Sequence, residues 1–327
     1  TRPNILLVIG DDIGVDASVL TSRYAGATGA VATPNLARLA DNGLVFDSVW
    51  ANPLCSPTRA TIVSGSYGNR TGVTNVGDVL PTTSSSLFRY IAASSPARYD
   101  MAVFGKWHLG GPVGSIQHVR DLGVPAFRGF LAGSVNSYYN WTVASLDGSQ
   151  QVTTTYATTA ITDFAVDFLR SHRSSRPSDP WFVYLAYNAA HFPNEVPPRA
   201  LHSVPLGALN PGTVSNTVPV YKAMIQSMDS ELGRVLAEVD LANTVVIFLG
   251  DNGTPANVQD SGVGLRGAKQ TIYEGGVHVP MLIAGAGVTR RGREAALVTT
   301  TDLYATIAAL SGIGVSQVND SFSLVPL

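Results

Sequence analysis

Short apolar runs that end in polar residues recur along this chain and alternate with segments of helical spacing. Residues 4–9 (NILLVI) form one such run, and Gly10, Asp11 and Asp12 follow it directly. A continuous apolar run of this length is typical of a strand buried on both faces of a parallel sheet. The alternation therefore predicts an α/β fold with a doubly wound, largely parallel central sheet and helices on both of its faces.

The same pattern continues to residue 310. Thr33 and Pro34 are typical of a helix start, as N-cap and first-turn residue, and Gly43 of its end. Further strands are expected at residues 44–50, 99–104, 181–187, 244–249 and 279–284, and further helices at residues 58–63, 155–172, 220–239 and 302–310. Residues 110–151 and 192–219 interrupt the alternation, and we expect them to be loops over one edge of the sheet.

Length and composition limit the number of domains and the classes of partner. The 327 residues fit one large domain or a domain with an appendage. With 45% hydrophobic and 13% charged residues, the chain has a globular composition. Its formal net charge of −2 disfavours a nucleic-acid binder. No apolar run reaches the ~18 to 20 residues that span a bilayer, so we expect no membrane span.

Polar side chains gather where the expected strands end. They are Asp11, Asp12, Lys106, His108, His191, Asp251 and Asn252. Because the carboxyl ends of parallel strands line one crevice, these side chains are expected to converge. Three acids and an amide can supply oxygen ligands for a hard cation such as Ca²⁺ or Mg²⁺. Lys106, His108 and Lys269 add donors, so the site suits an oxyanion held beside a cation.

Each feature has a simpler explanation when it is taken alone. Acids after a strand, such as Asp11 and Asp12, commonly serve turns. A lone His191 is more often a surface or core histidine than a catalytic one. Cys55, the single cysteine, would most often be a small buried apolar residue. The motifs around these residues change that balance.

The motifs resemble those of a known enzyme family. Residues 55–59 (CSPTR) match the C-x-P-x-R signature of the type I, formylglycine-dependent sulfatases of the alkaline-phosphatase-like superfamily. The resemblance continues through residues 105–110 (GKWHLG), 191–193 (HFP), 250–253 (GDNG), 266–269 (RGAK), 274–280 (EGGVHVP) and 301–304 (TDLY). It covers nearly the whole chain in the family's order, which implies a single sulfatase catalytic domain over residues 1–327.

The resemblance implies a mechanism centred on Cys55. A separate maturation enzyme, the formylglycine-generating enzyme or an equivalent, would oxidise it to formylglycine. One oxygen of the formylglycine hydrate would attack sulfur, and the other would later expel sulfate. Arg59 and the helix N-terminus would stabilise the negative charge. Asp251 is implied to take the proton of the nucleophile.

The remaining site residues also match positions with roles in the family. The calcium ligands are implied to be Asp11, Asp12, Asp251 and Asn252, with residue 55 near the ion. Lys106, His108, His191 and Lys269 match positions that contact the substrate's sulfate ester. His108 would also assist sulfate release, and His191 would protonate the leaving alcohol.

Two departures and two alternatives accompany the resemblance. His278 stands where the family usually has Arg, which puts a supporting ion pair in doubt. The chain stops at Leu327, where relatives continue into a small antiparallel sheet, so this subdomain is expected to be absent or truncated. A phosphate or phosphonate ester hydrolase is the first alternative, although Asn252 favours calcium over a transition metal. A catalytically silent domain that binds sulfated glycans is the second.

The substrate and the compartment are less constrained. A small-molecule or saccharide sulfate ester is implied, and Tyr138, Tyr139 and Trp141, with residues 192–219, are candidates to line an aryl, sugar or choline site. A start without Met and the habits of the family favour a periplasmic or secreted protein, with the cytoplasm as the alternative.

Overall fold

The structure is a computed structural model that describes residues 2–18, 20 and 31–327. Within these residues, one mixed sheet of ten strands has the order β10-β2-β9-β8-β1-β7-β3-β4-β5-β6. At its centre, β1 (Asn4–Gly10) pairs in parallel with β7 (Trp181–Ala186) and β8 (Thr244–Gly250). The expected doubly wound α/β architecture is confirmed.

The outer strands give the sheet its mixed character. β3 (Asp100–Lys106) pairs in parallel with β7, and β10 (Gly292–Thr299) pairs in parallel with β2 (Gly43–Trp50). By contrast, β9 (Met281–Gly285) runs antiparallel between β2 and β8. The apolar run expected at residues 279–284 therefore forms a buried strand, β9, but this strand runs antiparallel to both of its neighbours.

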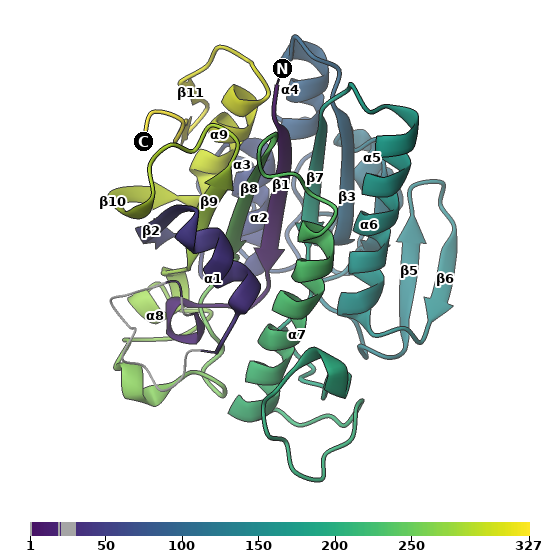
Figure 1. Ribbon diagram of the computed structural model, residues 1–327, viewed down its shortest axis with the longest axis vertical. Coiled ribbons are helices and arrows are strands. Elements are labelled where there is room, and N and C mark those ends of the chain that lie inside the picture. Colours follow the sequence, from purple (N-terminus) through teal and green to yellow (C-terminus); the bar gives the residue numbers. More distant parts are fainter. Residues whose placement is uncertain (1, 19, 21–30) are drawn as a thin grey trace.

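Helices cover both faces of the sheet (Figure 1). One face carries α1 (Pro34–Asp41), α6 (Ala157–Ser175) and α7 (Val218–Leu236), and the other carries α2 (Cys55–Ser64), α4 (Leu87–Ser94) and α9 (Leu303–Leu310). Because side chains alternate along a strand, Leu6 and Val8 of β1 enter the first apolar layer, while Ile5 and Leu7 enter the second. These helices bury apolar side chains against the sheet, and α2 is buried along its whole length.

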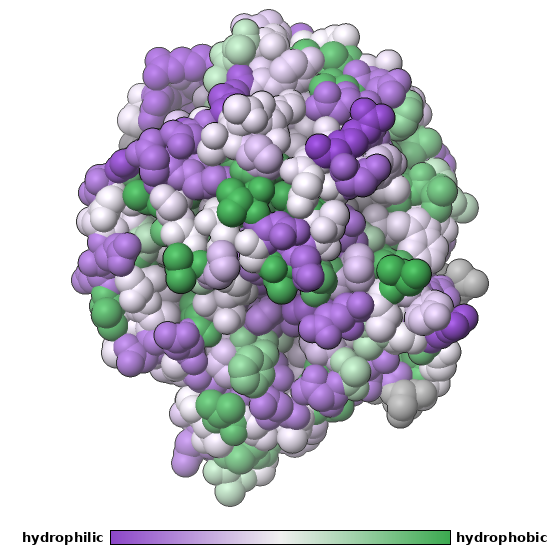
Figure 2. Space-filling view, turned by 180° about the vertical axis from the view of Figure 1, so that it is seen from behind, coloured by the Kyte–Doolittle hydropathy of each residue, from purple (hydrophilic) through white to green (hydrophobic). Residues whose placement is uncertain are grey.

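Several shorter elements complete the described part of the fold. They are η1 (Val15–Ala17), α3 (Gly68–Thr71), α5 (Ile116–Asp121), η3 (Arg199–Leu201), η4 (Ser261–Val263), α8 (Glu274–Val277), η5 (Thr300–Asp302), and the antiparallel pair β11 (Gln317–Val318) and β12 (Ser321–Phe322). On the face behind the view of Figure 1, apolar side chains are interspersed with polar ones (Figure 2). Among the described helices, none has the length and apolar character needed to cross a bilayer.

The expectation of a loop at residues 110–151 is wrong. This stretch forms α5 and three strands, β4 (Phe127–Phe130), β5 (Trp141–Ser145) and β6 (Gln150–Thr153), which extend the sheet beyond β3. These strands have four or five residues, and β6 is largely exposed, so they show no clear apolar period. Residues 192–219 remain mostly irregular: they contain η3, an isolated bridge between Glu195 and Val214, and the first two residues of α7.

The start of α1 also differs from the expectation. Thr33 occupies the N-cap position, but its hydroxyl finds no hydrogen-bond partner among the described residues. Instead, the Asp229 carboxylate of α7 accepts bonds from the backbone N–H groups of Asn35 at 3.0 Å and Leu36 at 2.8 Å. A side chain distant in the sequence thus satisfies the free N–H groups of the first helical turn.

Candidate active site

The carboxyl ends of the central strands bring the predicted polar residues together. Asp11 and Asp12 follow β1, Lys106 ends β3, and Asp251 follows β8. The Lys106 Nζ lies 2.5 Å from Asp11 Oδ2, and the backbone N–H of Asp12 donates to Asp251 Oδ1 at 3.1 Å. Gly105, with φ of 96°, permits this approach, because a Cβ at this position would lie 1.9 Å from the carbonyl oxygen of Ala186.

Helix α2 presents Cys55 to this cluster. The helix begins at Cys55 itself, three residues earlier than expected, and ends at Ser64, with Gly65 as the predicted stop in the C-cap position. Pro57 does not prevent the early start, because N–H groups of the first turn have no acceptor within the helix. The Cys55 Sγ is buried and lies 3.3 Å from His108 Nδ1. Residue 55 therefore sits at the positive end of the helix dipole.

Arg59, one turn further along α2, is fully buried against the carboxylates. Its Nε and Nη2 donate to Asp251 Oδ2 at 3.0 and 2.8 Å, and its Nη1 donates to the Lys106 carbonyl oxygen at 3.1 Å. Burial opposes the charge, but the carboxylates of Asp251 and Asp11 outweigh it and raise the pKa of Arg59. The guanidinium thus joins α2 to the ends of β3 and β8.

Lys269 and Asn252 hold the second aspartate. The Lys269 Nζ lies 2.5 Å from Asp12 Oδ1, and the Asn252 Nδ2 donates to the same oxygen at 2.7 Å. Burial opposes ionisation of Asp12, but the charges of Lys269 and His191 outweigh it and lower the pKa of Asp12. Three buried carboxylates, Asp11, Asp12 and Asp251, thus lie among three cations, Arg59, Lys106 and Lys269.

Two oxygen atoms in this cluster are left without donors. Neither Asp11 Oδ1 nor Asn252 Oδ1 has a hydrogen-bond partner among the described residues, and both are buried. The Asn252 amide orientation is fixed, because its Nδ2 donates to Asp12 Oδ1 and to the Gly253 carbonyl oxygen. Asp11, Cys55 and Asp251 also offer ligand atoms within 4.8 Å of one another. Unpaired buried oxygens are costly, and this donor set fits a hard cation such as calcium.

His108 lies beside residue 55 in a constrained conformation. Its φ is 54°, and Gly133 packs so closely that a Cβ there would lie 2.7 Å from the His108 Nε2. Burial, with the charges of Lys106 and Arg59, lowers the pKa of His108 to about 2, so the ring is neutral. Burial also raises the pKa of the Cys55 thiol. An unmodified cysteine here is therefore a poor nucleophile.

Left-handed backbone at residues other than glycine marks the same region. In the described part of the chain, such residues are Asp12, His108, Gln270 and Asn319. Asp12 and His108 belong to the site, and Gln270 follows Lys269 directly. Strained backbone of this kind concentrates at functional sites, where the surrounding structure holds it in place.

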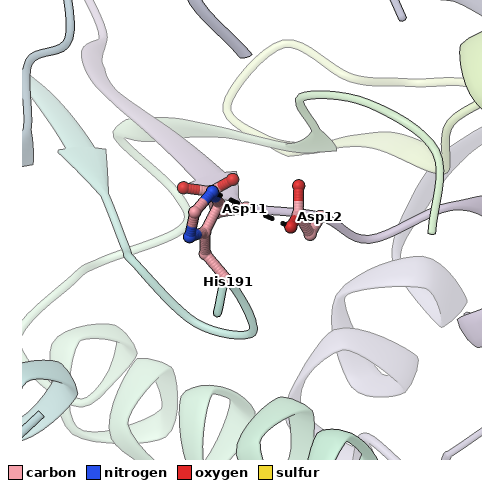
Figure 3. Close-up of side chains that lie close together, drawn as sticks. All are labelled: Asp11, Asp12 and His191. Carbon is pink, nitrogen blue, oxygen red and sulfur yellow. Dashed lines mark ion pairs between the residues drawn. The ribbon is translucent and has the colours of Figure 1, made fainter. Parts of the chain in front are cut away.

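His191 approaches the cluster from the loop after β7 (Figure 3). Its Nδ1 lies 2.7 Å from the Phe192 carbonyl oxygen, which can only accept, so Nδ1 carries a proton. Its Nε2 lies 4.0 Å from Asp12 Oδ2. Burial lowers the pKa of His191, although the nearby carboxylates oppose this shift. The imidazole therefore presents Nε2 to the site.

Of the three aromatic residues expected to line the substrate site, Tyr138 and Trp141 are buried and do not line it, whereas Tyr139 is half-buried. Tyr138 is fully buried, and its hydroxyl lies within hydrogen-bond distance of the carbonyl oxygens of Asn188, at 2.7 Å, and His191, at 2.9 Å. Trp141 is also buried, and the Tyr139 hydroxyl donates to the Val196 carbonyl oxygen. Tyr138 thus supports the His191 loop from beneath rather than lining the site. Its sequence context gave no signal for this position.

His118 is a second residue that the sequence did not single out. It accepts a hydrogen bond from Trp107 Nε1 at 3.0 Å through Nδ1, and its Nε2 donates to the Leu80 carbonyl oxygen at 2.8 Å. Burial lowers the pKa of His118, which favours this neutral form. The bond fixes Trp107 between Lys106 and His108. No local pattern identifies such a role for a histidine eight residues past the motif at residues 105–110.

His278 retains a carboxylate partner despite replacing the arginine usual in the family. Its Nδ1 lies 3.3 Å from Glu274 Oε1, and its Nε2 lies 3.0 Å from the Asp47 carbonyl oxygen. The ring also contacts Trp50, with the ring centroids 4.9 Å apart. A carboxylate therefore lies within ion-pair distance of residue 278, where the substitution put a supporting ion pair in doubt.

Comparison with known proteins identifies the family to which this chain belongs. A family model described as Sulfatase matches residues 3–313. The chain belongs to the sulfatase family. Among curated sulfatases, an uncharacterised one from Escherichia coli is 27% identical and the match covers 99% of this chain and 66% of that protein. The N-acetylgalactosamine-6-sulfatase of Homo sapiens is 29% identical, with 95% of this chain and 62% of that protein covered.

The fold of this member of the sulfatase family is similar to that of a solved structure. The crystal structure of Ps i-CgsB in complex with k-i-k-neocarrahexaose superposes with a TM-score of 0.83 at 26% identity. The match covers 100% of this chain and 76% of that one. The chain spans between 53% and 68% of the length of the first curated relatives that it matches.

Proposed function

We propose that this chain hydrolyses a sulfate ester, with residue 55 as the nucleophile after its conversion to formylglycine. The observation that carries the proposal is the position of Cys55. It is buried at the start of α2, within a ligand group that includes Asp11 and Asp251, and its Sγ lies 3.3 Å from His108 Nδ1. Three buried or nearly buried cations, Arg59, Lys106 and Lys269, surround this point and suit an oxyanion.

A calcium ion would be held by oxygens of Asp11, Asp12, Asp251 and Asn252, with residue 55 beside it. The unpaired Asp11 Oδ1 and Asn252 Oδ1 support this assignment. When bound, the ion supplies positive charge that polarises a sulfate oxygen and favours the ionised nucleophile. Asn252 has only an amide to offer at this position, which favours an oxygen-ligated ion over a transition metal.

The chemistry at residue 55 requires more than a thiol. Burial raises the pKa of the thiol, and a single sulfur atom lacks the second hydroxyl through which sulfate can be released. Formylglycine, as its hydrate, supplies that pair of oxygens. The start of α2 and the Arg59 guanidinium then stabilise negative charge at this position. Asp251 would accept the proton of the nucleophile, and neutral His108 is placed to take a proton during sulfate release.

Lys106 and Lys269 would bind the sulfate group, and His191 would protonate the leaving alcohol. An ammonium group has three donors, and one donor of Lys106 and one of Lys269 point at aspartate oxygens, so further donors remain for sulfate oxygens. Because His191 Nδ1 donates to the Phe192 carbonyl oxygen, the proton for the leaving alcohol would come from Nε2 of the imidazolium. The leaving group would then lie on the His191 side of the site.

Within sulfate esters, a sulfated saccharide is the substrate class that we place first. Relatives include an N-acetylgalactosamine-6-sulfatase, and Ps i-CgsB was solved with k-i-k-neocarrahexaose. Tyr138 and Trp141 are buried, so these two rings offer no floor for an aryl group. Phe192, at 57% exposure, is the aromatic side chain next to His191 that a sugar ring could contact.

The test is a release assay on protein co-expressed with a formylglycine-generating enzyme. Peptide mass spectrometry quantifies conversion of Cys55, and a panel of sulfated mono- and oligosaccharides is compared with phosphate esters of the same alcohols. We expect sulfate release that scales with conversion and needs calcium. Preferential hydrolysis of the phosphate esters would favour the phosphohydrolase alternative. Binding of sulfated glycans without turnover by converted protein would favour the silent domain.

A further inference from the structure

Asp11, Asp12 and His191 form a second group of potential ligands beside the calcium site. Their ligand atoms all lie within 4.8 Å of one another. The two aspartates lie at the end of β1, and His191 faces them from the loop after β7 (Figure 3). Unlike the proposed calcium ligands, this group contains an aromatic nitrogen. Its chemistry therefore differs from that of the oxygen-only site.

The free atoms of these three residues face one another. Lys269 and Asn252 both donate to Asp12 Oδ1, whereas Asp12 Oδ2 lies 4.0 Å from His191 Nε2. Lys106 occupies Asp11 Oδ2, whereas the buried Asp11 Oδ1 has no hydrogen-bond partner in the described part of the chain. Each aspartate thus has one oxygen held by a lysine and another that a cation could use.

The orientation of His191 is that of a metal-bound histidine. Its Nδ1–H donates to the Phe192 carbonyl oxygen at 2.7 Å, so a neutral ring directs the lone pair of Nε2 towards the carboxylates. Histidine ligands of metals usually donate their other N–H to a carbonyl or carboxylate in this way, which fixes the tautomer and the ring orientation. The separation of 4.0 Å between Nε2 and Asp12 Oδ2 leaves no direct hydrogen bond between them.

We propose that Asp11, Asp12 and His191 bind a transition-metal ion of the Zn²⁺ type, in a mode that excludes calcium. One imidazole and two carboxylates are a donor set that Zn²⁺ accepts, whereas calcium takes oxygen ligands. In this mode His191 replaces Asp251 and Asn252 as the partner of the aspartate pair. The bound ion occupies the Nε2 that the leaving alcohol needs, so it inhibits the enzyme.

Charge explains why the two modes exclude each other. Both use Asp11 and Asp12, and the three carboxylates of the cluster already lie among Arg59, Lys106 and Lys269. One divalent ion adds two positive charges, which an anionic substrate can offset. Two such ions would leave several buried charges without compensation. The competition with calcium rests on the proposed function, but the zinc site itself does not.

Isothermal titration of metal-free protein with ZnCl₂ alone and with CaCl₂ alone tests the proposal. We expect His191→Gln to lower the zinc affinity at least ~10-fold and to change the calcium affinity less than threefold. Asn252→Ala should do the reverse and weaken calcium more than zinc. His202→Gln removes a histidine outside the cluster and should leave both affinities unchanged. Excess calcium should displace zinc from the wild type.

Cobalt provides a second readout that needs no variant. Co²⁺ bound to the wild type should show visible absorption characteristic of a nitrogen ligand, and calcium should abolish it. The proposal is overturned if His191→Gln binds zinc as tightly as the wild type, if it weakens zinc and calcium equally, or if both ions bind together. These binding experiments contain no sulfate ester, so they are independent of whether the proposed hydrolysis is found.

Discussion

The two sides of the active site are built in different ways. On one side, Asp11, Arg59 and Lys106 are fully buried and extend from strand ends or from α2. On the other side, the side chain of His191 is 17% exposed, Phe192 is 57% exposed, and both lie in an irregular segment. The first side holds charges in a fixed arrangement, and the second borders solvent. This difference suits the proposed reaction, in which the sulfate group stays constant and the alcohol varies.

The largest expected effect comes from the buried side. Cys55→Ala should reduce turnover by a factor on the order of 10⁶, as removal of a covalent nucleophile does in other enzymes. The fold should persist, since the change removes a single sulfur atom. Sulfate release by fully converted wild type and by the variant measures the effect, with circular dichroism as the control. Retained multiple turnover would remove residue 55 from the mechanism.

On the exposed side, the effect should depend on the substrate. His191→Ala should slow hydrolysis of saccharide sulfates by ~10² to 10⁴, the range of general acid catalysis, and spare nitrophenyl sulfate, whose leaving group needs little protonation. Rates across leaving groups of graded pKa measure this dependence. An equal loss on every substrate would assign His191 to sulfate binding instead.

Loss of a buried ion pair should lower the free energy of unfolding more than loss of a surface ion pair. Arg59→Met leaves the buried carboxylates of Asp251 and Asp11 without their partner, which should lower the free energy of unfolding by about 3–5 kcal/mol. The matched control is Arg170→Met, because Arg170 pairs with Glu238 at the surface. This substitution should lower the free energy of unfolding by about 0–1 kcal/mol. Urea denaturation of both variants measures the contrast. Similar losses at the two positions would contradict it.

His118, which accepts a hydrogen bond from Trp107 between Lys106 and His108, should make the free energy of unfolding depend on pH. Burial lowers the pKa of His118, so as the pH falls below about 6.5 the unfolded state takes up a proton that the folded state does not. The free energy of unfolding should therefore fall on acidification from pH 7.5 to 5.5. His118→Gln should reduce this slope, by at most about 1.4 kcal/mol per pH unit. Denaturation at several pH values checks it, and an unchanged slope would exclude His118 as a contributor.

The smallest effect is expected at the rim. Phe192→Ala removes an exposed ring, so the free energy of unfolding should change by no more than about 0.5 kcal/mol. The KM for saccharide sulfates should rise, while turnover of nitrophenyl sulfate stays unchanged. Steady-state kinetics on the two substrates provide the comparison. A loss of stability comparable with that of Arg59→Met would show that the two sides do not differ as described.

Local patterns in the sequence determined the framework of this protein. The apolar run of β1 and the polar residues after it predicted a buried parallel strand with a site at its carboxyl end. Residues 105–110 and 250–253 placed Lys106 and Asp251 at the same edge, and the motif at Cys55 indicated the family. These inferences succeed because buried strands and strand-end loops have signatures within a few neighbouring residues.

Other features were decided only by the tertiary structure. The short strands β4 to β6 have no clear apolar period: β4 pairs with β3, and β5 and β6 each pair with the strand before them. Asp229 caps α1 from α7, and Tyr138 and His118 support site loops through bonds to distant residues. Each of these interactions joins segments far apart in the chain. Side-chain periodicity reports burial along one segment, whereas a partner across the sheet is fixed only when the layers pack together.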